Sequence, residues 1–445
     1  MARTLGLFLM IALTMLASAA FGEATEDELR ERDDTIAELV RKVDVLTDEV
    51  ATLRTQVAVP EETELKGAYG FGPAASKIYG IERGLSIGGY GEVNYINFIG
   101  DEEDSNPDRS DALRTVIYLG YKFTDSIVFN SEIEFEHATT SNVNNGAGSG
   151  SVSVEFAALD FFWRPELNAR AGILLVPMGF VNEVHEPPFF YGVQRPETEV
   201  RILPSTWHEN GVGVFGNLGE SFEYRSYVIA GFNAQEFTDA GIRGGRQQGN
   251  RSLTEDFAWV TRVDWTPDAV PGFLLGGSFY LGDSGQDVEL DPGGDVPDAR
   301  LWIFEGHAQY QNGPFHARGL FAFSSLSDAR ELNEVLLAND PGFDGPVADE
   351  MLGGYAEVAY DVYPSLFGSE DRQLEPFVRV EYVDTQYDVP SGFDANRDRA
   401  NWIHAGGVNF YPHPNVVLKV EYRNVNTRGQ GERADELGLG MGFAF

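Results

Sequence analysis

Residues 84–445 consist of about sixteen short segments in which apolar and polar residues alternate, and the connections between them are alternately long and short. Strict alternation is the pattern of β-strands that have one apolar and one polar face. The short connections include "TDS", "RPEL", "NLGES" and "NGP", whereas the long ones include residues 177–206, 233–254, 283–299 and 327–352. Long and short connections sorted to opposite ends are typical of an up-and-down barrel. The sequence therefore predicts an all-β fold, an antiparallel up-and-down barrel of about 16 strands.

The alternation also predicts which face of each strand is in contact with water. In "NSEIEFEH", residues 130–137, the side chains of Glu132, Glu134 and Glu136 share one face, and Ile133 and Phe135 share the other. A closed barrel of sixteen strands is wide enough to enclose water. We therefore expect a transmembrane barrel whose apolar faces contact lipid and whose polar faces, including the three glutamates, face channel water.

The N-terminus predicts export from the cytoplasm. The stretch "MARTLGLFLMIALTMLASAAFGEA" has one basic residue, Arg3, an apolar run from Leu5 to about Leu16, and the small residues Ala17 and Ala19. This arrangement indicates a secretory signal peptide over residues 1–22, cleaved near residues 19–23. The apolar run is shorter than the roughly 20 residues that a membrane-spanning helix needs.

A short coiled coil is predicted for residues 26–59. This interval contains no glycine, is rich in charged residues, and is followed by Pro60. Apolar residues recur seven apart, with leucines three positions after them, as in an a/d seam. The seam consists of Leu29, Ile36, Val43, Val50 and Val57, together with Leu39, Leu46 and Leu53. An amphipathic helix on the protein's own surface is the alternative. Residues 60–83, rich in Gly and Pro, are expected to be a linker to the barrel at 84–445.

Composition excludes some classes of partner. The formal net charge of −38 would repel a phosphate backbone, which argues against nucleic acid binding. The chain has no cysteine, so disulfides do not stabilise it. Arginines number 27 and lysines 5, and the rigid guanidinium fork suits fixed positions among carboxylates.

The architecture resembles that of bacterial outer-membrane porins. The C-terminal "ELGLGMGFAF" is an alternating strand that ends on Phe445, similar to the closing strand of outer-membrane barrels, whose terminal aromatic is part of the signal read by the barrel assembly machinery. The segments "LSIGGYGEVNY", 177–210 and "GMGFAF", together with the coiled coil, resemble the broad group related to the phosphate-selective (porin O/P) family. The resemblance implies an outer-membrane location with the coiled coil in the periplasm, and a homotrimer with a channel through each subunit. By itself the a/d seam, Val or Ile at a and Leu at d, favours a dimer.

The resemblance also implies that the third external loop folds into the barrel and narrows it. By position this loop is residues 177–206, which contain five prolines and the aromatic residues Phe189, Phe190 and Tyr191. An ordered loop packed against the barrel is expected. Its charged residues either line the narrowest part of the path or pair with wall carboxylates, as Arg195 and Arg201 could. The constriction candidates are Glu183, His185, Glu186, Arg195, Glu197, Glu199, Arg201, His208 and Glu209.

The inward face of the strands predicts a channel with weak selectivity. The expected lumen-lining residues are Arg114, Lys122, Glu132, Glu134, Glu136, Arg170, Arg225, Arg262, Arg318, Arg379, Lys419 and Arg423. Further inward acids are Glu92, Glu223, Asp264, Glu305, Glu357, Asp361, Glu381 and Glu421. A phosphate channel needs successive cationic sites, and this abundance of acid puts phosphate selectivity in doubt. We expect passive diffusion of small polar solutes or ions, with a mild preference for cations; an anion-selective channel is one alternative.

A second alternative is a structural barrel with a plugged lumen that tethers the outer membrane to the cell wall. A helical stalk of about 30 residues spans only ~45 Å, which is short for a tether. The sequence has no G-x-S-x-G, P-loop, H-E-x-x-H or cysteine metal motif, so we expect no enzyme, metal or cofactor. Ser205 and His208 are the closest approach to a lipase-like pair. The acidic loops, such as residues 282–298, lack EF-hand spacing and are expected to be solvated.

Overall fold

The computed structural model of the protein describes Arg30 and residues 34–47, 65–100, 107–142, 149–429 and 433–445. The chain divides into two units, Met1–Val59 and Pro60–Phe445. The signal peptide predicted at 1–22 lies outside the described residues, as does most of the coiled coil predicted at 26–59. Residues 34–47 are helical. Among the described residues, no helix is both long enough and apolar enough to cross a membrane.

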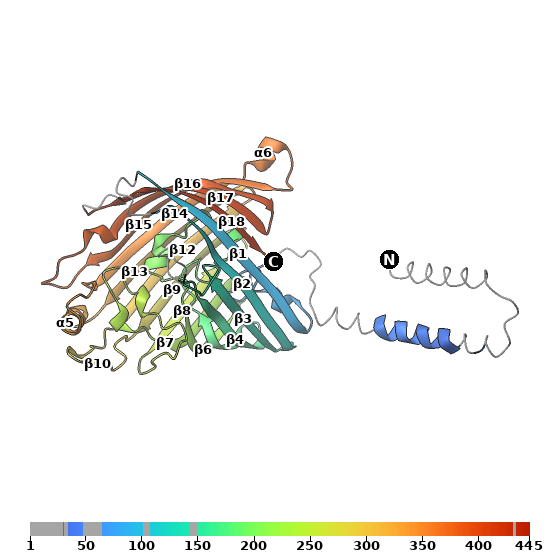
Figure 1. The fold of residues 1–445 in the computed structure, drawn as a ribbon, viewed down its shortest axis with the longest axis horizontal. Coiled ribbons are helices and arrows are strands. Elements are labelled where there is room, and N and C mark those ends of the chain that lie inside the picture. The colour runs from blue at the N-terminus through green and yellow to red at the C-terminus, as the bar shows by residue number, and fades with distance from the viewer. Residues whose placement is uncertain (1–29, 31–33, 48–64, 101–106, 143–148, 430–432) are drawn as a thin grey trace. The chain divides into compact units, whose positions relative to one another are not determined.

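The second unit is a closed antiparallel barrel of sixteen strands, which confirms the predicted fold class (Figure 1). Each strand pairs with its neighbours in the barrel in chain order, as in an up-and-down barrel. The barrel strands are β1 Gly84–Ile99, β2 Arg109–Thr124, β3 Ile127–Glu136, β4 Val152–Arg164, β5 Leu167–Leu175, β6 His208–Leu218, β7 Phe222–Ala230, β8 Phe257–Trp265, β9 Phe273–Gly282, β12 Leu301–Asn312, β13 Phe315–Leu326, β14 Glu350–Tyr360, β15 Gln373–Asp388, β16 Ala400–His413, β17 Val416–Thr427 and β18 Asp435–Ala444.

The remaining elements belong to the connections. They are the helices α3 Lys77–Gly80, α4 Glu197–Arg201, α5 Ala329–Asn339 and α6 Tyr363–Phe367, the 3₁₀ turns η1 Pro187–Phe189, η2 Ala234–Glu236, η3 Arg243–Gly245 and η4 Arg397–Arg399, and the two-stranded β10 Glu289–Leu290 and β11 Gly294–Asp295. Long connections follow the odd-numbered barrel strands from β1 to β9 and then β13, β15 and β17. Short ones follow β2, β4, β6, β8, β12 and β16, whereas the connection after β14, residues 361–372, is longer and contains α6. One end of the barrel therefore carries the long loops and the other the short turns.

The C-terminal strand closes the barrel against the first strand. Tyr90 of β1 pairs with Ala444 of β18, and the pairing continues to Ile99 and Asp435. The terminal residue extends this ladder, because the Phe445 N–H donates to the Gly89 carbonyl oxygen at 2.9 Å, and the Gly89 N–H donates back at 3.0 Å. Closure leaves no free sheet edge at the end of the chain.

The strands alternate between an apolar outer face and a buried inner face. In β17, Leu418, Val420 and Tyr422 are exposed on the outside, whereas Lys419 and Glu421 are buried inside. The outer face of β18 likewise exposes apolar side chains as far as Phe445. This outer band is what a lipid-facing surface requires, and it has the period-2 pattern expected from the sequence.

An apolar core occupies much of the barrel interior near the long loops. Trp207 stacks on Phe232 with ring centroids 4.7 Å apart, and both pack against Tyr280 at the end of β9. The same cluster includes residues at the long-loop ends of β7 to β17, such as Ile303 and Val425. The long loops thus fold inward and bury apolar surface across the interior.

Replacing Val420 by Arg tests the outer face. Val420 lies near the middle of β17, so an arginine there would place a charge in the apolar band and lower the free energy of unfolding by about 2–4 kcal/mol. Urea unfolding of the protein in lipid vesicles measures the change. The control is Val416→Arg on the same face at the strand's end, where we expect about 0–1 kcal/mol. Equal losses for the two variants would contradict a lipid-facing band.

Candidate functional site

The connection between β5 and β6, residues 176–207, crosses the barrel interior and is held there by wall carboxylates. Glu421 of β17 accepts hydrogen bonds from the Val193 and Gln194 N–H groups, each at 2.9 Å. Glu381 of β15 accepts the Thr198 N–H at 2.6 Å. Buried backbone donors need partners, and here inward glutamates supply them. These glutamates therefore fix the loop in position.

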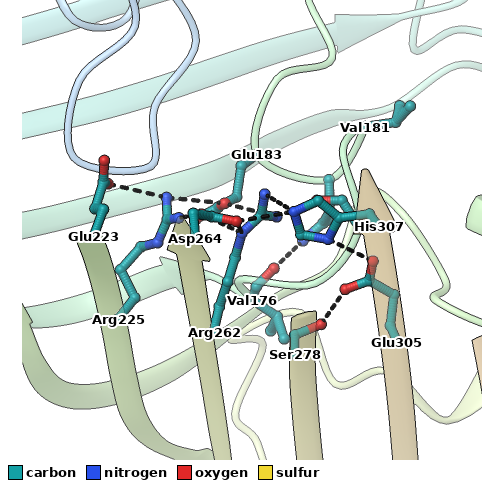
Figure 2. A network of polar contacts seen from close by, with 12 residues as sticks. Val176, Val181, Glu183, Glu223, Arg225, Arg262, Asp264, Ser278, Glu305 and His307 are labelled. Atoms are coloured by element: carbon teal, nitrogen blue, oxygen red, sulfur yellow. Dashed lines mark hydrogen bonds and ion pairs between the residues drawn. The ribbon is translucent and has the colours of Figure 1, made fainter. Parts of the chain in front are cut away.

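Ion pairs join β7, β8 and the loop inside the barrel (Figure 2). Glu183 of the loop lies 3.0 Å from an Arg225 nitrogen and 3.3 Å from an Arg262 nitrogen. Asp264 accepts a hydrogen bond from Arg262 Nε at 2.8 Å and also pairs with Arg225. All four side chains are buried. Two arginines and two carboxylates balance one another, which is how buried charges are tolerated.

The network continues through a buried histidine onto β12. His307 lies between two acids, with Nε2 2.9 Å from Asp264 and Nδ1 2.6 Å from Glu305. Glu305 also accepts a hydrogen bond from the Ser278 hydroxyl at 2.6 Å. Figure 2 shows this chain of contacts running across neighbouring strands beside the loop. The chain joins four strands to the loop.

A second network lies on β13 to β17, the strands that follow β12 around the barrel. Arg379 bridges Glu357 at 3.1 Å and Glu421 at 3.0 Å, and Arg318 binds Glu357 at 2.8 Å. The loop joins this side through Glu197, which pairs with Arg423 of β17 at 3.1 Å. Glu421 also accepts hydrogen bonds from the loop backbone. The ion pairs of the barrel wall and the attachment of the loop therefore share this carboxylate.

Residues 65–80 form a second insert in the interior, in the interval 60–83 that the sequence predicted as a linker. The Glu186 carboxylate accepts the Ala74 N–H at 3.0 and 3.1 Å and the Ala75 N–H at 3.3 Å. On the wall side, Asn130 of β3 donates to the Ala75 carbonyl oxygen at 3.0 Å. This segment is therefore held between the barrel wall and the 176–207 loop. We call it the N-terminal insert.

Aromatic packing and one arginine complete the attachment of the N-terminal insert. Arg170 of β5 donates to the Tyr69 carbonyl oxygen at 3.0 Å and lies 4.1 Å from the centre of the Phe71 ring. Its charge is balanced by Asp160 at 2.6 Å, which also accepts the Tyr79 hydroxyl at 2.6 Å. The guanidinium thus combines an ion pair, a backbone hydrogen bond and a cation–π contact.

The three glutamates of β3 point inward, as their spacing predicts, but two of them do not face open water. Glu132 is buried and lies 3.2 Å from His185 of the loop. Glu134 is buried and lies 3.3 Å from Arg114. Glu136 is partly exposed and accepts the Ser151 hydroxyl at 2.9 Å. The expectation that all three face channel water is therefore wrong for Glu132 and Glu134, because the loop and neighbouring side chains cover them.

The other predicted lumen residues also lie on the inner face of the barrel. Of these, Lys122 and Arg318 are partly exposed, whereas Arg114, Arg170, Arg225, Arg262, Arg379, Lys419 and Arg423 are buried. Each of these side chains is therefore on the face of its strand that the alternating pattern predicts. Their surroundings are packed protein, since the loop and the N-terminal insert fill space that a bare barrel would leave to water.

Most constriction candidates hold the loop in place. Besides Glu183, His185, Glu186 and Glu197, whose contacts are given above, Glu199 accepts the Tyr355 hydroxyl at 2.6 Å, Arg201 pairs with Glu197 at 2.6 Å, His208 lies 3.7 Å from Glu155, and Glu209 accepts the Gln247 N–H at 2.8 Å. Arg195 has a buried Nη2 without a hydrogen-bond partner. The Ser205 hydroxyl is buried without a partner too, so Ser205 and His208 are not arranged as nucleophile and base.

A cavity of about 840 Å³, lined by charged and aromatic residues, lies among the short turns, the loop and the N-terminal insert. Its wall includes backbone from Leu65 to Phe71 and aromatic side chains such as Phe180 and Tyr191. Seven carboxylates and four arginines line it. These are Glu183, Glu223, Asp264, Glu357, Glu370, Asp371 and Glu375, with Arg225, Arg262, Arg318 and Arg372. The cavity wall therefore carries an excess of negative charge.

Comparison with known proteins identifies a family and a fold. No family model matches the chain. A protein of Aquifex aeolicus (strain VF5) is 35% identical over 377 residues, which are 83% of this chain and 82% of that protein. The chain belongs to the same family as this protein. The Aquifex protein is described only as uncharacterized, so membership supplies no activity.

Solved structures share the barrel. One is a loop L8 deletion mutant of OmpT, an outer membrane protein of Vibrio cholerae. The match spans 82% of this chain and 100% of the OmpT chain, with a TM-score of 0.51 and 11% sequence identity. The match with the outer membrane channel DcaP of Acinetobacter baumannii spans 81% of this chain and 97% of the DcaP chain, with a TM-score of 0.49 and 14% sequence identity. The likeness to OmpT confirms the predicted barrel fold. Membership in the phosphate-selective group stays a prediction.

The N-terminal insert and its acceptor Glu186 were not predicted as a unit from the sequence. Residues 65–80 contain Tyr69, Phe71 and Tyr79, and aromatic residues in a supposed linker are the one signal that could have indicated packing. Glu186 was a candidate for the narrowest part of the path. Nothing in its sequence context indicates that its partners are backbone groups about 112 residues away.

The Glu186 carboxyl predicts that attachment of the N-terminal insert depends on pH. Burial raises its pKa from 4.5 to about 7, although hydrogen bonds from the Ala74 and Ala75 N–H groups oppose the rise. A raised pKa in the attached state means that attachment strengthens as pH falls from about 7 towards 4.5, and that the added strength is absent above about 7. We expect the amides of residues 68–78 to be roughly tenfold or more better protected from hydrogen exchange at pH 5 than at pH 8, after correction for intrinsic rates.

Glu186→Gln is the matched control, since it keeps the shape and an acceptor oxygen but cannot ionise. Protection in this variant should change little between the two pH values. If the pH dependence persisted in Glu186→Gln, a different group would be its cause.

Proposed function

We propose that the protein is an outer-membrane porin with a narrow aqueous path, through which small hydrophilic solutes and ions diffuse passively. The observation that carries this proposal is the cavity of about 840 Å³ inside a closed barrel, with eleven Asp, Glu and Arg residues on its wall. A barrel whose inner side chains were present only for stability would be expected to bury apolar groups there, because buried charges cost free energy. Charged groups around a cavity suit a wall along which hydrated solutes pass.

The distribution of polar and apolar residues supports a route through the barrel. At the long-loop end, the apolar core packs against the inner faces of β7 to β17. Near β1 to β3 and β18, the inner residues stay polar and partly exposed, among them Asp111, Glu136 and Glu436. We infer that solutes enter beside these residues, pass the 176–207 loop and leave through the cavity at the short turns.

The charge of the cavity favours cations over anions. Its seven carboxylates outnumber its four arginines, and Arg225 and Arg262 are already paired with Glu183 and Asp264. Fixed negative charge raises the local concentration of cations. Phosphate-type selectivity is the weaker proposal, since arginines neutralised by neighbouring carboxylates offer little to an anion.

A structural barrel with a plugged lumen is the second candidate. The N-terminal insert and the 176–207 loop both occupy the interior and bury most of the inward charges. That observation favours a closed resting state, and the conductance measurement below distinguishes it from a porin.

We further propose that the chains assemble as a homotrimer through the coiled coil in the periplasm, with Phe445 read by the assembly machinery. The described helix, 34–47, supports association, because Ile36, Leu39, Val43 and Leu46 are each about half exposed in the single chain. Apolar residues at this spacing are stabilised when another helix covers them. Native mass spectrometry of the detergent-solubilised protein should give three chains per particle, and a monomer would contradict the proposal.

Planar bilayer recordings test the function. The purified protein should produce stepwise currents in KCl, and a salt gradient should show a potassium-to-chloride permeability ratio above one. Glu223→Gln removes a carboxylate that lines the cavity and is 38% exposed. We expect the ratio to fall by about 1.5- to 3-fold, because one solvated charge contributes under about 1 kcal/mol.

The matched control is Glu220→Gln, an exposed acid in the neighbouring short turn that does not line the cavity. Its ratio should equal that of the unmodified protein. Absence of current would favour the structural barrel, and an unchanged ratio in Glu223→Gln would place the selective part of the path elsewhere.

A further inference from the structure

One buried carboxylate on the cavity wall lacks a cationic partner. Glu375 of β15 lines the cavity, and its side chain is only 4% exposed. Among the described contacts its ion-pair neighbour is His316 of β13, with Nε2 at 3.8 Å, its hydrogen-bond partner is the Tyr191 hydroxyl, and no Lys or Arg forms an ion pair with it. Two other inward acids differ from Glu375, because Glu357 binds two arginines and Glu421 binds Arg379.

Tyrosines and the histidine surround Glu375 without supplying positive charge. The Tyr191 hydroxyl and His316 Nδ1 lie 2.9 Å apart, and the Tyr191 ring stacks on Phe377 at 5.7 Å. Tyr411, also on the cavity wall, donates its hydroxyl proton to the Pro188 carbonyl oxygen at 3.2 Å. The surroundings of Glu375 therefore include aromatic rings, tyrosine hydroxyl groups and an imidazole.

Two buried or partly buried cations of β13 and β17, Arg318 and Lys419, bind other partners. Arg318 binds Glu357 at 2.8 Å. Lys419 donates to the Phe190 carbonyl oxygen at 3.0 Å and lies 3.6 Å above the Phe190 ring. A second acid, Asp361, accepts the Tyr363 and Leu374 N–H groups, each at 3.0 Å. Among the described contacts it forms no ion pair with a Lys or Arg. Within the described part of the chain, Glu375 and Asp361 are therefore two buried carboxyl groups without a Lys or Arg partner.

We propose that this end of the cavity is a binding site for a small organic cation, with the Glu375 carboxylate as the anchor for a primary ammonium group. A buried carboxylate is costly unless a cation compensates it, and an ammonium group supplies both charge and three donors. Tyrosine rings beside the carboxylate add cation–π attraction. Lys419 on Phe190, one residue from Tyr191, shows the same pairing of an ammonium group with a loop aromatic inside this chain.

A metal ion suits the site less well than an ammonium ion. Within the part of the chain that the structure describes, no group of three His, Asp or Glu side chains is arranged to hold a metal. The cavity volume of about 840 Å³ also leaves room for a small amine together with water. The inference depends on the proposed function only in requiring that solutes reach the cavity from water.

Calorimetric titration of the full-length protein in detergent with putrescine, 1,4-diaminobutane, tests the site without requiring conduction. We expect saturable binding of putrescine and none of 1,4-butanediol, a neutral molecule of similar length. Glu375→Gln should weaken putrescine binding tenfold or more. Glu370→Gln removes an exposed carboxylate from the same cavity wall and should change affinity less than twofold.

Three outcomes would overturn the site: no binding to the unmodified protein, equal loss in both variants, or equal binding of butanediol. The shift of the folded barrel on unheated SDS gels verifies that each variant folds.

Potassium currents separate this proposal from the proposed function. Putrescine should block the current of the unmodified protein and block Glu375→Gln at least tenfold more weakly. If the protein binds putrescine but carries no current, the porin proposal fails and the site stands. If current flows and putrescine neither binds nor blocks, the site fails and the porin stands.

Discussion

Hydrogen bonding between wall carboxylates and the backbone of the 176–207 loop determines the interior of this barrel. Sixteen strands enclose more space than their own side chains fill. The loop that enters this space brings backbone N–H groups that must find acceptors away from bulk water. Glu421, Glu381 and Glu186 provide acceptors at three places around the interior, the first two for the loop and the third from the loop to the N-terminal insert. The charge pattern, the cavity and the placement of residues 65–80 follow from these contacts.

Arginine is the cation that this arrangement needs. Arg379 contacts two glutamates and two loop carbonyl oxygens with one guanidinium. Arg262 similarly joins Asp264, Glu183 and the Gly179 carbonyl oxygen. A lysine ammonium could not span such fixed, separated acceptors, because its donors radiate from one atom. The ratio of 27 arginines to 5 lysines thus has a structural reason in the interior.

The fold could be predicted almost completely from the sequence, whereas the interior could be predicted only in part. Val420 and Glu421 fall on opposite faces because strand side chains alternate, and this rule depends on nothing distant. The inward direction of Glu132 followed in the same way. The burial of Glu132 could not be predicted in this way, because His185, which contacts it, lies 53 residues further along the chain. The packing of residues 65–80 could not be predicted for the same reason. Their partners Asn130, Arg170 and Glu186 belong to strands and a loop that follow later in the chain.

The sequence by itself determined the strand number, the order of long and short connections, the outward apolar band and the inward parity of each charge, since all of these arise from local period-2 alternation and turn composition. Only the tertiary structure decided which inward charges are paired, which backbone groups they hold, and which carboxylate is left facing the cavity without a cation. Those outcomes depend on how a loop and the N-terminal insert fill a closed volume. Such filling is a property of distances between residues far apart in the chain, which no local pattern encodes.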